Sequence, residues 1–267
     1  MQLKTEKLKT SVRKMFSLKE DAASHEEIRD RLLSGGKITG TNMCVLICAM
    51  IIASTGLITN STAVIIGAML ISPIMGSILA AAYGTASCDI PLVRNHIVGF
   101  VIQIAISVAA STVFFLIVPE KGATSELLAR TSPTFYDIIV ATAGGVAGVI
   151  GQTRRDKANT IIPGVAIATA LMPPLCTCGY SIANGKWMML LGAGYLFLVN
   201  SYFIFLSSNI VLALLKVPKV RELTEKEWKR VNRGMIRNMV IMLIPSLIPI
   251  LFMIFDIDPF HLFFVKQ

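Results

Sequence analysis

The chain has 267 residues, of which 54% are hydrophobic, and its mean hydropathy is +0.68. This apolar content exceeds what a soluble core of that length requires, so the composition excludes an ordinary soluble globular protein. The net charge of +9 follows the alternation of apolar stretches and polar segments along the chain, and this distribution argues against nucleic-acid binding.

Seven apolar stretches are long enough to be membrane-spanning helices, because about 20 apolar residues cross the hydrocarbon layer. The first, fourth and seventh are short, so we expect them to be little tilted or partly re-entrant. The sequence therefore predicts an all-α, polytopic membrane protein with about seven transmembrane helices. The predicted spans are residues 43–58, 63–82, 97–118, 135–151, 160–182, 188–215 and 239–255.

Basic residues indicate how these helices are oriented. The first forty residues are polar and hold nine Lys or Arg without an apolar run, so we expect no cleavable signal peptide and a cytoplasmic N-terminus. In that orientation the inner loops contain twelve basic residues and the outer loops three, as the positive-inside rule requires. An odd number of crossings then places the C-terminus outside.

These features predict five segments along the chain. The polar N-terminal segment contains a capping box, Ser17 to Glu20, and its helix is expected to stop at Gly35 and Gly36. A second capping box, Thr224 to Glu227, starts a basic amphipathic helix that suits an anionic membrane surface or a partner. The segments are a cytoplasmic end at 1–40, a three-helix repeat at 41–118, its inverted copy at 119–215, the amphipathic segment at 216–238, and the seventh helix with an outer tail at 239–267.

The repeat is predicted from a shared motif. Residues 67–76 read GAMLISPIMG and residues 168–177 read ATALMPPLCT, and an offset of 101 residues places Pro73 on Pro174. Three crossings per unit force the second unit to enter the membrane upside down, as in many transporters. The uncharged turn at 59–62 and its basic counterpart at 153–157 fit this inversion.

The prolines are the strongest candidates for a functional site. Ser72 and Pro73 read as an N-cap followed by a proline at the first helical position, which would start a half-helix near the bilayer centre. Pro173 and Pro174 could do the same. Such helix starts carry partial positive charge and free N–H groups, which suit an anion or carboxylate. A simple proline kink is the alternative.

Few other polar groups lie in the apolar stretches, and none at mid-depth is charged. Asn200 is the most prominent, and it could bind solute or join helices by hydrogen bonds. We therefore predict a substrate-binding region without catalytic residues or metal ligands. The candidate residues are Asn60, Ser61, Gly67, Ser72, Pro73, Gly76, Pro163, Gly164, Pro173, Pro174, Thr177 and Asn200.

Enzymatic motifs are absent from the sequence. Neither H-E-x-x-H nor G-x-S-x-G occurs, so we expect no enzyme and no cofactor. The five cysteines are odd in number and lie mostly in apolar stretches, which disfavours disulfides. Cys176 and Cys178 lack a zinc-type spacing.

The chain resembles a known family at three places. Residues 53–76 read ASTGLITNSTAVIIGAMLISPIMG, residues 163–175 read PGVAIATALMPPL, and residues 196–200 read LFLVN. These stretches are similar to the prokaryotic hydrophobic membrane family known as domain of unknown function 389. The resemblance covers about residues 40–215 and implies a prokaryotic plasma membrane protein, without naming an activity.

The sequence favours one function and leaves two alternatives. We expect a transporter or permease for a small solute or ion, embedded in the lipid bilayer as a homo-oligomer, with its site at the proline breaks. An oligomeric ion channel could use the same backbone groups as a filter. A non-transporting scaffold or stress-response partner could instead dock through the basic segment.

Overall fold

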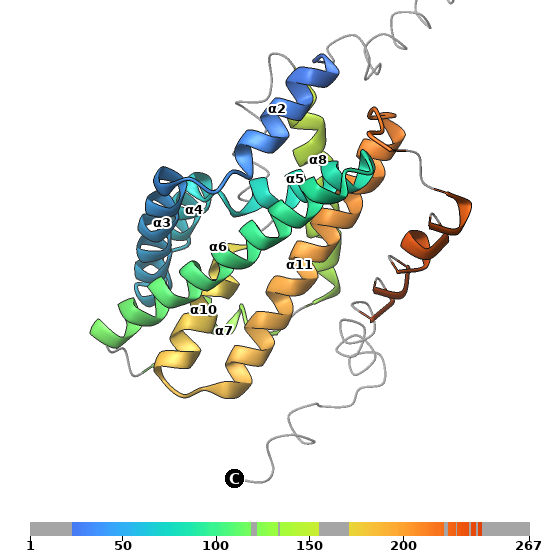
Figure 1. Ribbon diagram of the computed structural model, residues 1–267. Helices are drawn as coiled ribbons and strands as arrows, with labels where there is room; N and C mark the ends of the chain where they lie inside the picture. Colours follow the sequence, from blue (N-terminus) through green and yellow to red (C-terminus); the bar gives the residue numbers. More distant parts are fainter. Residues whose placement is uncertain are drawn as a thin grey trace, which may run out of the picture.

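The computed structural model describes residues 23–118, 122–132, 134–154, 171–221 and 224–241, the last range with gaps at 228, 235 and 239. Its described residues are helical or lie in turns and loops, and Figure 1 shows the labelled helices gathered into one bundle. The helices are α2 (His25–Gly35), α3 (Gly40–Ile58), α4 (Thr62–Ile71), α5 (Ile74–Ala86), α6 (Ile90–Ile117), α7 (Ser125–Leu128), α8 (Phe135–Gln152), α10 (Met172–Ala183) and α11 (Trp187–Leu214).

Four of these helices, α3, α6, α8 and α11, are long and apolar enough to cross a membrane, and the α4–α5 pair makes a fifth crossing if it is counted as one span. The all-helical membrane architecture is thus confirmed. The predicted crossing at 160–182 begins outside the described residues, and the one at 239–255 lies almost wholly outside them, so the total of seven remains a prediction.

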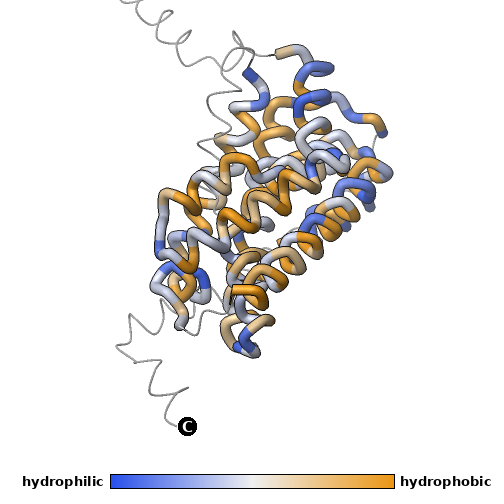
Figure 2. The backbone as a smooth tube through the Cα atoms, turned by 90° about the vertical axis from the view of Figure 1, so that its left-hand side faces the viewer, coloured by the Kyte–Doolittle hydropathy of each residue, from blue (hydrophilic) through white to orange (hydrophobic). Residues whose placement is uncertain are grey.

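The polarity of α6 is the reverse of that in a soluble helix. Its outward side chains include Val101, Val113 and Leu116, which are all more than half exposed, whereas Gln103 and Ser107 are fully buried. Figure 2 shows hydrophobic residues along the long helices and hydrophilic ones gathered toward the ends of the bundle. Apolar side chains that face outward match a lipid environment. Polar side chains buried within a membrane cost free energy, which points to a structural or functional role for them.

Helix α6 begins seven residues earlier than the sequence predicted. The Asp89 carboxylate accepts the Leu92 backbone N–H at 3.1 Å, and Pro91 occupies the first turn, where its missing N–H does no harm. Arg94, one of the twelve basic residues assigned above to inner loops, therefore lies within the second turn of a helix, and its assignment to a loop was wrong.

The α5–α6 and α10–α11 hairpins share one turn geometry, displaced by 97 residues. Cys88 and Gly185 both have positive φ, 58° and 66°. Asp89 N–H donates to the Gly84 carbonyl and Lys186 N–H to that of Ser181, each at 2.8 Å. The helices that follow, α6 and α11, both have 28 residues, and in Figure 1 the two turns lie at opposite ends of the bundle.

This displacement differs from the 101 residues that matched the prolines in sequence. The difference is about one helical turn, and its reason is local. Pro73 precedes the first residue of α5, whereas Pro173 and Pro174 lie inside the first turn of α10. The two hairpins are therefore better aligned by their turn geometry, 97 residues apart, than by the positions of their prolines.

Helices α5 and α10 are the enclosed helices of the bundle. Both pack against α6 and α11, α5 also against α2, and α10 also against α3. Every residue from Leu171 to Ser181 is buried. With 13 and 12 residues they are about 18–20 Å long, too short for a hydrocarbon core of about 30 Å.

Candidate functional site

The second predicted crossing is broken at Ser72 and Pro73. Helix α4 ends at Ile71, α5 begins at Ile74, and the two axes differ by 46°. The break itself is as predicted, but its cap is not, because Pro73 occupies the N-cap position. Ser72 instead ends α4, and its hydroxyl oxygen accepts the Ile74 N–H at 3.5 Å.

Helix α10 begins with buried prolines. Leu171 is its N-cap, and Pro173 and Pro174 lie in its first turn. Neither proline has an N–H to offer a ligand, so this helix start has fewer free donors than an ordinary one. The Thr177 hydroxyl donates to the Pro173 carbonyl at 2.9 Å, so this donor is already used within its own helix. The predicted site residues Pro163 and Gly164 lie outside the described residues.

Gln103 connects α6 to the start of α5. The Ser77 hydroxyl donates to Gln103 Oε1 at 3.0 Å, and both side chains are fully buried. Gln103 Nε2 and Ser107 Oγ, one turn further along α6, have no hydrogen-bond partner within the described part of the chain. An unpaired buried polar atom costs free energy, so this pair marks a place where a further hydrogen-bonding group would be stabilised.

Asn200 holds the corresponding position on α11, 97 residues after Gln103. Its side chain is buried, and Asn200 Oδ1 and the neighbouring Ser201 Oγ also lack partners among the described residues. Phe100 and Phe197 precede these amides by three residues on their helices, and their rings stack with centroids 5.8 Å apart. On both α6 and α11, therefore, a side-chain amide with an unpaired atom lies three residues after a phenylalanine, and the two phenylalanines stack on each other.

Three predicted site residues lie away from this region. Asn60 has φ 54° in the α3–α4 turn, and its Oδ1 accepts the Ser125 hydroxyl at 2.9 Å and the Glu126 N–H at 3.1 Å. Ser61 is the N-cap of α4 without a side-chain bond. Gly67 is exposed and has open space where a Cβ would stand. These residues therefore belong to a turn and to the exposed face of α4.

Gly76 belongs to the contact between α5 and α2. A Cβ at Gly76 would stand 2.0 Å from the Gly35 carbonyl oxygen, so only glycine allows the two backbones to approach this closely. A Cβ at Gly36 would likewise meet His96 Nδ1 and Ala80 Cβ at 2.9 Å. The end of α2 therefore lies against the first turns of α5, next to Ser77.

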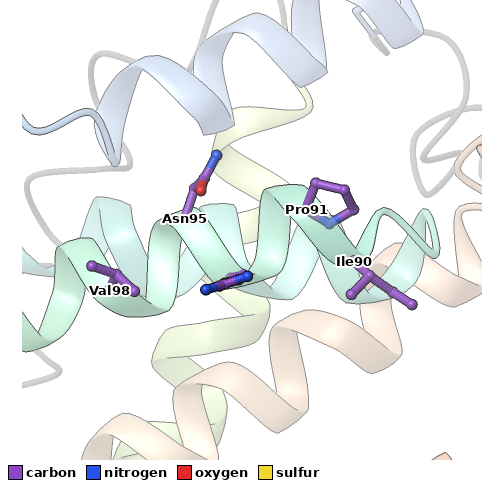
Figure 3. A pocket seen from close by; sticks show the side chains of 5 residues that line it. Ile90, Pro91, Asn95 and Val98 are labelled. Carbon is purple, nitrogen blue, oxygen red and sulfur yellow. The ribbon is translucent and has the colours of Figure 1, made fainter.

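A separate pocket follows the outward face of α6. Its volume is about 670 Å³, and Figure 3 shows Asn95 pointing toward α2 while Ile90 points away from it. This pocket contains none of the predicted site residues. Within the described residues, no group of three or more His, Cys, Asp or Glu side chains could hold a metal ion. The lining residues are Ile90, Pro91, Arg94, Asn95 and Val98.

The family is decided by a sequence comparison. The pattern of the family described as domain of unknown function DUF389 matches residues 69–206, which is more than half of the chain. The chain belongs to the DUF389 family. This DUF389 protein is also 25% identical over 205 residues to an uncharacterized protein of Methanocaldococcus jannaschii, covering 77% of the present chain. The match spans 63% of that relative's length. No solved structure matches this DUF389 protein.

Proposed function

We propose that this DUF389 protein is a membrane transporter or permease for a small solute or ion. The proposed binding region lies along α6 and α11, at Gln103 and Asn200, beside the starts of α5 and α10. The observation that carries the proposal is that four buried atoms on α6 and α11, Gln103 Nε2, Ser107 Oγ, Asn200 Oδ1 and Ser201 Oγ, have no hydrogen-bond partner among the described residues.

A purely structural role for these side chains predicts a different pattern. Polar residues that join membrane helices do so by hydrogen bonds across the interface. Ser111 is an example, since its hydroxyl donates to the Cys176 carbonyl at 3.0 Å and lies 3.1 Å from the Ser54 hydroxyl. Gln103 Oε1 accepts from Ser77, whereas Gln103 Nε2 has no partner in the part of the chain that the structure describes. Unused donors and acceptors in a membrane interior favour a bound or passing solute.

We further propose that the bundle consists of two three-helix units in opposite orientations, followed by a seventh crossing. The matching hairpin turns 97 residues apart, the equal lengths of α6 and α11, and the packing of each short helix against both long ones support this relation. Inverted repeats with interrupted helices at their interface are a recurring transporter plan. A prokaryotic plasma membrane, an inner N-terminus, an outer C-terminus and a homo-oligomer complete the proposal.

Flux through reconstituted protein tests this function. Proteoliposomes are loaded with a panel of neutral solutes, anions and cations, and the release of each is compared with that from protein-free liposomes. We expect protein-dependent flux of at least one solute, which Asn200→Leu reduces and Ser207→Ala leaves unchanged. Ser207 is the matched control because its hydroxyl is already bonded to the Phe203 carbonyl at 2.8 Å. Flux that is equal in both variants would contradict the proposed site.

A further inference from the structure

Resting on the proposed function, we infer that the solute bound at Gln103 and Asn200 is electrically neutral and carries both hydrogen-bond donors and acceptors. The unpaired atoms have this mixed character. Gln103 Nε2 is a donor, Asn200 Oδ1 an acceptor, and the hydroxyls of Ser107 and Ser201 can act as either. A small amide or polyol can bond to both the donors and the acceptors of this set. An anion would use only the donors, and a cation only the acceptors.

The described residues that are buried offer these atoms no compensating charge nearby. Among the described residues that are buried, Arg154 is the formally charged one, and it lies after α8 at the α2 end of the bundle. An unpaired ion in a membrane interior is far costlier than a neutral polar group. The buried prolines in the first turn of α10 also withhold two N–H donors that an anion would need. A neutral solute therefore fits better than an ion.

Four probes separate the charge classes. Urea and glycerol are neutral, and their entry into proteoliposomes is followed by stopped-flow light scattering. Potassium formate and methylammonium chloride report anion and cation flux through a membrane-potential dye. We expect protein-dependent flux of urea or glycerol, and no charge movement with either salt.

Matched variants tie this flux to the unpaired atoms. Ser201→Ala removes an unpaired hydroxyl, while Ser207→Ala removes a bonded one on the same helix. We expect neutral-solute flux to fall about tenfold in Asn200→Leu, the effect of losing one to two hydrogen bonds, to fall in Ser201→Ala, and to persist in Ser207→Ala. Flux confined to formate or methylammonium would overturn the neutral solute and leave transport standing. No protein-dependent flux of any probe would contradict both.

A second, independent set of contacts concerns α2 and α7, which lie at opposite ends of the bundle in Figure 1. Helix α7 is fastened to the α3–α4 turn, where Asn60 accepts from Ser125 and Glu126, and Thr124 Oγ1 donates to the Leu57 carbonyl at 2.6 Å. Each of these bonds joins residues at least 65 positions apart in the chain.

Helix α2 is fastened in the same manner to the end of α8. Ala23 N–H donates to the Thr153 carbonyl at 2.8 Å, and the Arg31 guanidinium donates to the Arg154 carbonyl. Helix α7 of the second unit is thus bound to the tip that follows α3 of the first unit, and α2, which precedes the first unit, is bound to the tip that follows α8 of the second. The residues after each helix also press on a long helix. Ile38 contacts Gly99 of α6, and the Thr131 carbonyl contacts Gly192 of α11.

We propose that α2 and α7 are a pair of lids that close the two ends of the solute path. The α2 lid is α2 with residues 36–39, and the α7 lid is α7 with residues 129–132. The α2 lid lies directly against Gly76, beside the Ser77–Gln103 bond. A solute that reaches Gln103 from this end must therefore displace the α2 lid. Closure at both ends corresponds to an occluded state, from which one lid opens at a time.

A cross-link that locks the α2 lid tests this device. Ala23 and Thr153 share a backbone hydrogen bond of 2.8 Å, which brings their Cα atoms within the usual reach of a disulfide. In proteoliposomes of the double variant Ala23→Cys and Thr153→Cys, we expect oxidation to abolish flux and dithiothreitol to restore it. The two single-cysteine variants control for the native thiols. Full flux through protein that mass spectrometry shows to be cross-linked would overturn the α2 lid, while absent flux in the reduced form would contradict transport itself.

Discussion

Phe100 on α6 and Phe197 on α11 stack with an interplanar angle of 19° and their ring centroids 5.8 Å apart. The two residues are separated by 97 positions, the same displacement that relates the α5–α6 turn to the α10–α11 turn. When equivalent residues of two related units touch, the axis that relates the units passes between them. This contact therefore supports the proposed inverted repeat.

A double-mutant cycle tests the energetic weight of this contact. Stacked aromatic pairs contribute about 0.5–1.5 kcal/mol beyond the area they bury. Phe100→Ala and Phe197→Ala should therefore be non-additive by about that amount in SDS unfolding from detergent micelles. The control cycle pairs Phe100→Ala with Phe115→Ala, which lies about 22 Å further along α6, and it should be additive. Additivity in both cycles would show that the rings do not stabilise each other.

The sequence predicted the membrane helices because their signal is local. An apolar run of 28 residues such as α11 is recognisable without knowledge of its neighbours. The break before α5 was predictable for the same reason, since Pro73 removes a backbone donor wherever it stands. The start of α6 was missed because the Asp89 cap extends the helix beyond its apolar part, through Arg94.

The candidate site was less predictable, because it depends on contacts between distant segments. Asn200 and Gln103 were recognisable as polar residues in apolar stretches, but only the structure shows that Gln103 meets Ser77 and keeps one atom unpaired. Asn60 was predicted to bind substrate, and its bonds to α7 cross 65 or 66 residues of sequence. The capping box that starts α2, Ser24 with Glu27, was also missed in the sequence. The capping box that was predicted instead, at Ser17, lies outside the described residues.

Two glycines of one motif should respond oppositely to alanine. At Gly76 the new Cβ would stand 2.0 Å from the Gly35 carbonyl oxygen, so backbone must shift, at about 1–3 kcal/mol for such overpacking. At Gly67 the space is open, and alanine improves helix propensity by up to about 1 kcal/mol. Thermal unfolding in detergent should show a lower midpoint for Gly76→Ala and an equal or higher one for Gly67→Ala. Similar midpoints would mean that α2 is not held at Gly76.

Pro73→Ala should separate function from stability. Alanine supplies the missing N–H and allows α4 and α5 to join into one straighter helix, which moves Ser77 relative to Gln103. We therefore expect flux to fall several-fold while the unfolding midpoint changes little. Pro91→Ala is the control, because Pro91 lies on the outward face in the first turn of α6, where proline only replaces an N–H that is free anyway. If Pro73→Ala leaves flux unchanged, the break does not build the site.

Asn60 tests the fastening of α7, and two substitutions divide its contributions. Asn60→Gly keeps the positive φ of 54° available but loses the bonds from Ser125 and Glu126, each worth about 0.5–1.5 kcal/mol. Asn60→Ala loses the same bonds and must also hold a left-handed backbone, at about 1–2 kcal/mol, partly offset by the lower chain entropy of alanine in the unfolded state.

Both Asn60 variants should unfold at lower temperature than the unsubstituted protein, with alanine the less stable of the two. Asn184→Ala is the matched control, since the Asn184 side chain donates only to the Tyr180 carbonyl four residues earlier and its φ is −107°. Because the lost bonds fasten α7, hydrogen exchange at residues 125–128 should accelerate in both Asn60 variants and stay unchanged in Asn184→Ala. Unchanged exchange at α7 in Asn60→Gly would show that the α7 lid is held by its packing rather than by this side chain.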